Sequence, residues 1–229
     1  MHWAPLAILF VAVLWLTWSY RRERERRRMM RGAFFAECCP LFEKWVITQD
    51  HLHYPVLAGR YQGLDIEIEP IIDDLTVRKL PSLWIKVSLK APVRYSGIFD
   101  LLIRPRGMEL YSPAFDLPFE IARPQDWPAD AIIRSDDSAN MPPLAVFAEH
   151  LHLFDDPKMK ELLVTPKGVR LVYQAAQASR GTYAVLRQSE FAETRLAPGL
   201  AARLLQAAAD IYRSVGPQKR PAVRHMELT

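Results

Sequence analysis

The sequence predicts an α+β fold: an N-terminal single transmembrane helix, then one soluble domain of antiparallel strands, arranged as a meander and packed with two or three helices. Three observations lead to this prediction. Residues 3–20 carry no charge, residues 43–111 repeatedly alternate apolar with polar side chains, and residues 198–215 place apolar side chains at helical spacing. Strands come first and helices later, which favours antiparallel pairing over alternating βαβ units.

The N-terminal segment has the length and the ends of a membrane span. Residues 3–20 form an uncharged stretch of 18 residues, which as a helix would measure about 27 Å, close to the roughly 30 Å of a bilayer's hydrocarbon core. Trp3 lies at one end and Trp15, Trp18 and Tyr20 at the other, where aromatic rings favour the headgroup level. A cleaved signal peptide needs a basic start and a small-residue cleavage site, and neither occurs here. We therefore expect a single-pass membrane protein.

The positive charge of the chain is concentrated beside this segment. Seven of the 30 Lys and Arg residues lie in residues 21–31 with two glutamates, which leaves 23 basic and 24 acidic residues in 32–229. A nucleic-acid-binding surface spreads its cations along the phosphates, so we expect no nucleic-acid partner. Lys and Arg beside a span mark the cytoplasmic side, so we expect a protein of the cell (plasma or inner) membrane with its N-terminus outside and its C-terminal domain in the cytoplasm. The residues expected to set this orientation and to contact anionic headgroups of the lipid bilayer are Arg21, Arg22, Arg24, Arg26, Arg27, Arg28 and Arg31.

The arginine-rich segment is expected to continue the helix out of the bilayer as a stalk that ends at Gly32. Glu23 with Arg27, and Glu25 with Arg28, have the spacing of helical ion pairs. The predicted organisation is a transmembrane helix and stalk at 1–32, a cytoplasmic α+β domain at 33–215 with a Pro-rich loop at about 112–143, and a disordered tail at 216–229.

The first part of the domain is predicted to be a meander. In one candidate strand Ile66 and Ile68 alternate with Glu67 and Glu69, and a later one contains Lys86 and Lys90, so we expect the acidic strand to pair with the lysine strand. The predicted strands are 44–48, 56–61, 64–69, 75–79, 83–90, 98–104 and 108–111.

The second part is predicted to be irregular at first and helical later. Six prolines interrupt residues 112–143, which predicts a long loop and a candidate partner surface. Asp156 and Pro157 have the residue types of a helix start. The predicted helices are 143–154, 157–164 and 198–215, with a hairpin of strands 168–175 and 182–187 between the last two.

Two His-x-His pairs, at 51–53 and 150–152, are the candidate metal ligands. Side chains two residues apart point the same way on a strand but not on a helix, and residues 150–152 fall in a predicted helix. We therefore interpret these histidines as surface or capping residues. A metal site, if the protein has one, would draw on His51, His53, His150, His152 and Asp155.

The sequence favours a binding role over catalysis. No phosphate-binding, dinucleotide-binding, serine-hydrolase or Cys-x-x-Cys motif occurs in it, Cys38 and Cys39 are expected to be free thiols, and no cofactor is expected. We expect a membrane-anchored interaction or scaffold domain that belongs to or regulates a membrane complex, through a membrane-protein partner or self-association. The alternative is a membrane-tethered metal-binding or hydrolytic enzyme that uses the histidines and aspartate named above.

Overall fold

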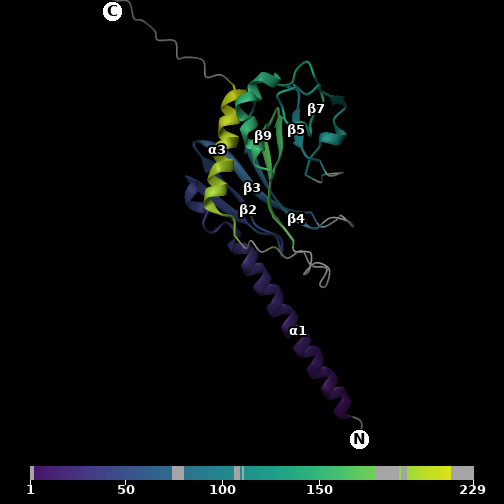
Figure 1. Cartoon of the computed structure of the whole chain (residues 1–229). Coiled ribbons are helices and arrows are strands. Elements are labelled where there is room, and N and C mark those ends of the chain that lie inside the picture. The colour runs from purple at the N-terminus through teal and green to yellow at the C-terminus, as the bar shows by residue number, and fades with distance from the viewer. Residues whose placement is uncertain are drawn as a thin grey trace, which may run out of the picture.

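The computed structural model describes residues 3–73, 80–105, 109, 111–178, 191 and 195–217, without the side chains of residues 4–7. A 30-residue helix, α1 (Trp3–Gly32), extends away from a body of strands, and the helix α3 (Pro198–Val215) lies along one side of that body (Figure 1). The predicted succession of an N-terminal helix, an antiparallel sheet and a C-terminal helix is therefore confirmed, and the fold is α+β.

The described strands form one nine-stranded sheet in the order β1-β2-β3-β4-β9-β8-β5-β7-β6, with every neighbouring pair antiparallel. The first four strands follow chain order as a meander. The strands are β1 (Lys44–Thr48), β2 (Val56–Tyr61), β3 (Leu64–Asp73), β4 (Ser82–Lys90), β5 (Phe99–Ile103), β6 (Phe119–Glu120), β7 (Ala131–Ser135), β8 (Met159–Thr165) and β9 (Gly168–Gln177). Short 3-10 helices connect them: η1 (Ala33–Phe35), η2 (Cys39–Leu41), η3 (Ala114–Asp116) and η4 (Leu144–Asp155).

The main core lies between one face of the sheet and α3. Ile66, Ile68, Ile85 and Val87 are among the strand residues that project onto this face, and all are at most 2 % exposed. The apolar stripe of α3 covers them, with Leu204, Leu205, Ala208, Ile211 and Val215 also at most 2 % exposed. Helical periodicity predicted the bounds of α3 correctly, because a helix with one buried stripe keeps the 3.6-residue pattern in its sequence.

The predicted helix at 157–164 is wrong, because this segment contains the central strand β8. Every residue of β8 except Thr165 is buried, since β8 lies between β9 and β5 and is covered on both faces. A strand that is buried on both faces loses the alternation that identifies a strand in the sequence. The helix was predicted because Asp156 and Pro157 have the residue types of a helix start.

The region 112–143 is more regular than expected. It contains η3 and two short strands, β6 and β7, and β7 pairs with β5. A five-residue strand between prolines is too short to show a period in the sequence, and its position depends on pairing with residues about 30 positions earlier. The predicted strand at 75–79 and the strand at 182–187 with its turn lie outside the described residues, and so do residues 108 and 110 of the predicted strand at 108–111.

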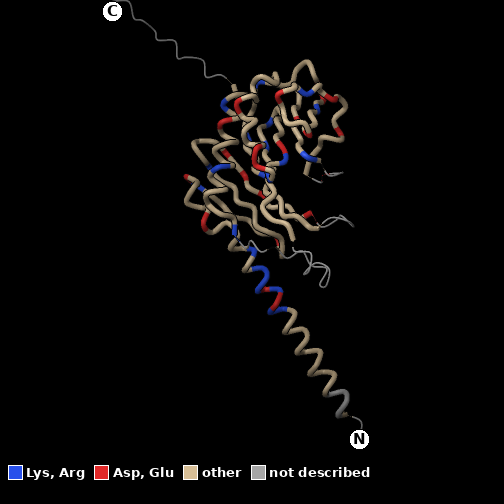
Figure 2. Tube along the Cα trace, in the orientation of Figure 1, with Lys and Arg blue, Asp and Glu red and all other residues tan. Residues whose placement is uncertain are grey.

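The N-terminal helix has two chemically different halves. Figure 2 shows Lys and Arg concentrated on the half of α1 next to the sheet, while the other half carries no charge. Among the residues that the structure describes, however, no helix combines the length and the apolar character that crossing a membrane requires. The predicted transmembrane helix at residues 3–20 is therefore not confirmed.

Candidate functional site

The uncharged half of α1 exposes large apolar side chains around its whole circumference. Successive residues such as Ile8, Leu9, Phe10 and Val11 point in directions about 100° apart on a helix, yet each is at least 61 % exposed. Soluble helices normally bury such a surface. The exposed set is Trp3, Ile8, Leu9, Phe10, Val11, Val13, Leu14, Trp15, Leu16, Trp18 and Tyr20, with exposed fractions of 50–82 %.

In the charged half of α1, some arginines contact neighbouring side chains, and others have no hydrogen-bond or ion-pair partner among the described residues. Arg27 Nε donates to Glu23 Oε1 over 2.8 Å, as the sequence predicted, and this hydrogen bond lowers the pKa of Glu23. The guanidinium of Arg22 stacks over Trp18 at 5.2 Å from the ring centre. The second predicted pair, Glu25 with Arg28, is not among the ion pairs that the described residues form.

The stalk end of α1 is fixed to the β1–β2 loop, residues 49–55. Arg31 Nη1 donates to the Leu52 carbonyl over 2.6 Å, and its guanidinium lies 5.1 Å from the ring centre of Tyr54. Gln49 Nε2 donates to the carbonyls of Arg28 (3.1 Å) and His53 (3.0 Å). These bonds hold the loop against the basic stretch of the helix.

Aromatic side chains that follow α1 in the chain strengthen its junction with the β1–β2 loop. Phe34 and Phe35 are at most 1 % exposed, and the Phe34 ring lies edge-on to Tyr54, with ring centres 4.9 Å apart. The Phe34 carbonyl also accepts a hydrogen bond from the Leu196 N–H (2.9 Å). The helix is therefore tied both to the first hairpin of the sheet and to the segment that leads into α3.

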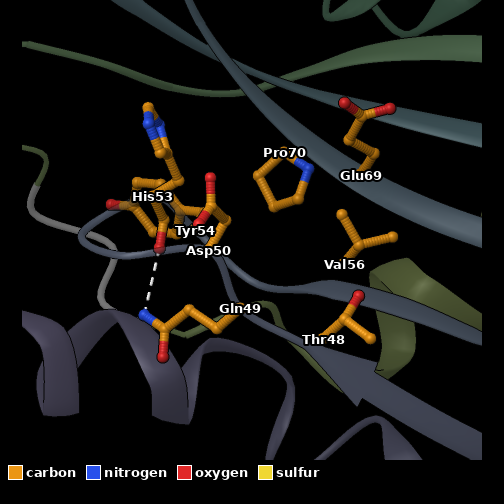
Figure 3. Close-up of a pocket in the computed structure, with 8 residues that line it drawn as sticks. All are labelled: Thr48, Gln49, Asp50, His53, Tyr54, Val56, Glu69 and Pro70. Carbon is orange, nitrogen blue, oxygen red and sulfur yellow. Dashed lines mark hydrogen bonds between the residues drawn. The ribbon is translucent and has the colours of Figure 1, made fainter.

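Two hollows lie at the β1–β2 loop. One is a cavity of about 290 Å³ lined by Arg21, Arg24, Glu25, Arg28, His51 and Leu52. The other, of about 420 Å³, is lined by Thr48, Gln49, Asp50, His53, Tyr54, Val56, Glu69 and Pro70. Figure 3 shows the second hollow, with His53, Tyr54 and Asp50 on its loop side and Val56 and Glu69 on its strand side. Three guanidinium groups make the first hollow cationic, while the second contains two carboxylates and one imidazole.

The five candidate metal ligands lie in two separate places. His51 and His53 lie in the β1–β2 loop, where His51 Nε2 is 3.4 Å from Asp50 Oδ1. His150, His152 and Asp155 belong to η4. Within the described parts of the chain, no three His, Cys, Asp or Glu side chains come together as metal ligands would.

The histidines of η4 have structural contacts. His150 is buried against α3, with Nε2 3.1 Å from Ser214 Oγ, and this burial lowers the pKa of its imidazole. His152 Nδ1 lies 2.7 Å from the Glu149 carbonyl. His152 is exposed, as the interpretation of these histidines as surface or capping residues expected, whereas His150 is buried against a side chain of α3 and does not fit that interpretation.

The two cysteines are free and buried in the segment between α1 and β1. Cys38 Sγ donates to the Leu196 carbonyl (3.3 Å) and Cys39 Sγ to the Phe35 carbonyl (3.4 Å). Burial raises the pKa of the Cys38 thiol to about 11. Because a thiolate is the reactive form, Cys38 is a packing residue at neutral pH.

A buried ionic cluster, which was not predicted from the sequence, lies on the sheet face opposite α3. Asp100 on β5 and Glu161 on β8 are fully buried there, and Ser112 Oγ donates to Asp100 Oδ2 over 3.4 Å. Arg170 of β9 pairs with Glu161 at 3.1 Å. Burial, followed by the negative charge of Glu161, raises the pKa of Asp100 well above its ordinary value.

A charged residue inside an apolar run was the available signal for this cluster. Asp100 stands in Phe-Asp-Leu-Leu-Ile and Glu161 in Met-Lys-Glu-Leu-Leu-Val, but only the pairing of β5 with β8 brings them together. The cluster lies within the sheet and lines neither of the two hollows. Its contacts are those of a structural element.

Comparison with known proteins adds little to this description. No family model matches the chain, and no curated protein does so. One solved structure, the crystal structure of the mycobacterial trehalose monomycolate transport factor A, TtfA, aligns with 72 % of this chain and 75 % of its own, at 12 % identity and a TM-score of 0.36. A likeness at this level supports no inference about fold or function.

Proposed function

We propose that the protein is a membrane-attached interaction protein, in which the uncharged half of α1 lies in lipid and the arginines beside it lie among the headgroups. One observation carries this proposal: a helix with large apolar side chains exposed on all sides continues directly into seven arginines. Removing each such side chain from water is worth about 1.5–3 kcal/mol, and arginines near anionic lipid add about 1 kcal/mol each.

Extraction experiments test the attachment. Membranes from cells that produce the full-length protein are washed with alkaline carbonate, and the protein is expected to stay in the pellet. Leu9→Lys with Val13→Lys places two charges in the middle of the uncharged half, so this variant is expected to move into the supernatant. Lys substitutions at the exposed domain residues Gln125 and Asp126 serve as the control and should leave the pellet fraction unchanged. Release of the unmodified protein by carbonate would overturn the proposal.

The orientation is the second part of the proposal: the N-terminus outside and the domain in the cytoplasm of a single-pass protein of the plasma or inner membrane. The arginine excess on the C-terminal side of the uncharged half supports it. A reporter that is active only outside the cytoplasm should stay silent when it is fused after residue 229. A cytoplasm-dependent reporter at the same position should be active. The reverse result would show that the domain faces outward.

The domain itself is proposed to bind a partner protein in the same membrane. The surface that supports this is β1, an edge strand of the described sheet that follows the junction with α1. Its Trp45 and Val46 are 52 % and 55 % exposed. A sheet edge with exposed apolar residues can pair with a strand from another chain. No contact among the described residues favours the enzyme alternative.

Site-specific cross-linking tests the partner surface. A photoreactive amino acid at Trp45 is expected to yield a discrete cross-linked species in native membranes, whereas the same group at Lys167, in the exposed β8–β9 turn, should not. A species of twice the monomer mass would identify self-association, and one of another mass would identify a different membrane protein. Equal cross-linking at both positions would contradict a role for the β1 edge.

A further inference from the structure

We propose that the cationic hollow between α1 and the β1–β2 loop binds the phosphate group of an anionic lipid headgroup. The ligands are the guanidinium groups of Arg21, Arg24 and Arg28, with His51 contributed by the loop. The proposal rests on the membrane attachment proposed above and adds to it a defined binding site, in place of a diffuse attraction between arginines and lipid.

The three arginines that line the cavity lie on one face of the helix. Residues 21, 24 and 28 are spaced i, i+3 and i+7, so their side chains lie along one face of α1. That face is turned toward the loop, because all three arginines line the same cavity as His51 and Leu52. Arg22 and Arg26 lie on other faces of the helix and do not line it.

The charge of the cavity is unbalanced. Its lining holds three guanidinium groups and a single carboxylate, that of Glu25. The guanidinium groups of Arg21, Arg24 and Arg28 have no hydrogen-bond or ion-pair partner among the described residues, whereas Arg27 has Glu23 and Arg31 has the Leu52 carbonyl. Guanidinium groups bind phosphate oxygens in pairs of parallel hydrogen bonds, and phosphate would supply the missing acceptors.

The cavity also lies at a suitable position along the helix. Arg21 is the first charged residue after the uncharged half, and Arg28 lies about 10 Å further along the axis. The headgroup region on each side of a bilayer is about 5–8 Å thick. With the uncharged half in lipid, the cavity therefore opens at the depth of the lipid phosphates.

The site is formed before a ligand binds. The loop is held by the bonds from Gln49 to the Arg28 and His53 carbonyls and from Arg31 to the Leu52 carbonyl. His51 adopts a left-handed backbone conformation, with φ of 45°, at the tip of this loop. A preformed cavity loses little conformational entropy when it binds a ligand. A lipid bound there would contact helix and loop together and would fix the angle of the domain to the membrane.

The test compares two variants of equal charge. The full-length protein is purified in a neutral detergent, and binding of phosphatidylglycerol is measured by native mass spectrometry. Arg21→Gln/Arg24→Gln/Arg28→Gln is expected to weaken binding by about tenfold or more, since a direct hydrogen bond to a charged group is worth about tenfold. Arg22→Gln/Arg26→Gln/Arg27→Gln removes the same charge from arginines that do not line the cavity, so it is expected to change binding by less than about threefold. Equal losses in the two variants would overturn the site.

A second comparison tests the loop and the source of the phosphate. His51→Ala should weaken phosphatidylglycerol binding, while His53→Ala, on the other side of the loop, should not. Phosphatidylcholine should bind more weakly than phosphatidylglycerol, and inorganic phosphate at millimolar concentration should not displace the lipid. Displacement by inorganic phosphate would show a site for free phosphate and would overturn the lipid assignment.

Binding in detergent does not require that the protein reside in a membrane. Failure of this inference is therefore distinguishable from failure of the carbonate extraction that tests the proposed function. Retention of full lipid affinity by the Arg21/Arg24/Arg28 variant would overturn the inference even if carbonate left the protein in the pellet.

Discussion

The two faces of the sheet are stabilised by different chemistry. One face lies under α3 and is filled by aliphatic and aromatic side chains such as Ile68, Val87 and Leu204. The opposite face has a smaller apolar cluster around Trp84 and Leu102 and buries Asp100 and Glu161 beside it. The first face gains stability from every residue that it buries. The second must offset the cost of burying charge by pairing it or by keeping it protonated.

A charge introduced into the apolar face is expected to have the largest effect. Leu204 is 2 % exposed in the middle of the α3 stripe, so Leu204→Asp buries a carboxylate with no cation prepared to pair with it. We expect a loss of at least about 4 kcal/mol in the free energy of unfolding, measured by denaturant titration. Gly199→Asp is the control, because a side chain added there meets no atom within 4 Å and an acid is favourable in the first helical turn. An unchanged denaturation midpoint in Leu204→Asp would show that the α3 stripe is not packed on the sheet.

On the opposite face, removal of the Arg170 guanidinium group is expected to lower the free energy of unfolding almost as much. Arg170→Met leaves the fully buried Glu161 without its partner, which should lower the free energy of unfolding by about 3 kcal/mol. The double variant Glu161→Met/Arg170→Met removes both charges and should recover most of that loss. Arg203→Met, which breaks a half-exposed pair with Asp156, should cost about 1 kcal/mol or less. A double variant no more stable than Arg170→Met would mean that the charges themselves are not the source of the cost.

The contrast between the faces also explains which parts of the structure were predictable. The period of two in β3 and in the second half of β4 and the helical stripe of α3 are visible in the sequence because each of these segments has one side more buried than the other. In β8, Leu162 and Leu163 are both buried, on opposite faces, so the alternation disappears and a helix was predicted in its place. Asp100 and Glu161 each stand next to apolar residues in the sequence, but only the pairing of β5 with β8 identifies them as neighbours.

For a similar reason, only one of the two parts of the candidate site could be predicted from the sequence. The seven arginines and the uncharged segment before them are adjacent in the sequence, so composition alone singled them out. The loop that completes the cavity lies more than 20 residues after Arg28, and its position depends on Phe34 packing against Tyr54. His51 was singled out as a metal candidate from the His-x-His spacing, but the structure places it beside arginines.

The protonation state of Asp100 gives the stability of the opposite face a pH dependence. Burial and the charge of Glu161 raise the pKa of Asp100 above its ordinary value of 3.8, while Arg170 and Ser112 act in the other direction. Arg134 on β7 also faces it across the sheet. Because the folded state holds this proton more tightly than the unfolded state, the resulting stability is complete below about pH 4 and is lost as the pH rises through the folded-state pKa.

Asp100→Asn tests that assignment. The variant cannot lose a proton, so at neutral pH it should be more stable than the parent protein. The difference should vanish near pH 4, and thermal unfolding between pH 4 and 8 measures it. Asp126→Asn, at an exposed position, should show no such trend. A parent protein whose advantage over Asp100→Asn grew with rising pH would mean that Asp100 is ionised and stabilising in the folded state.

The smallest effect is expected where the opposite face meets solvent, at the acid–lysine pairing of β3 with β4. Glu69 lies directly across from Lys86 and is paired with it, and Lys90 Nζ lies 2.6 Å from Glu67 Oε2, as the alternation of the two strands predicted. The side chain of Lys90 is 61 % exposed, so water and salt screen its charge. Lys90→Gln should therefore cost less than about 0.5 kcal/mol, and the cost should disappear at about 1 M salt, where the Debye length falls to about 3 Å. A loss comparable to that of Arg170→Met would mean that the Lys90–Glu67 pair is as well shielded from water as the cluster around Glu161. The buried ionic region of the sheet would then extend from β5 to β3.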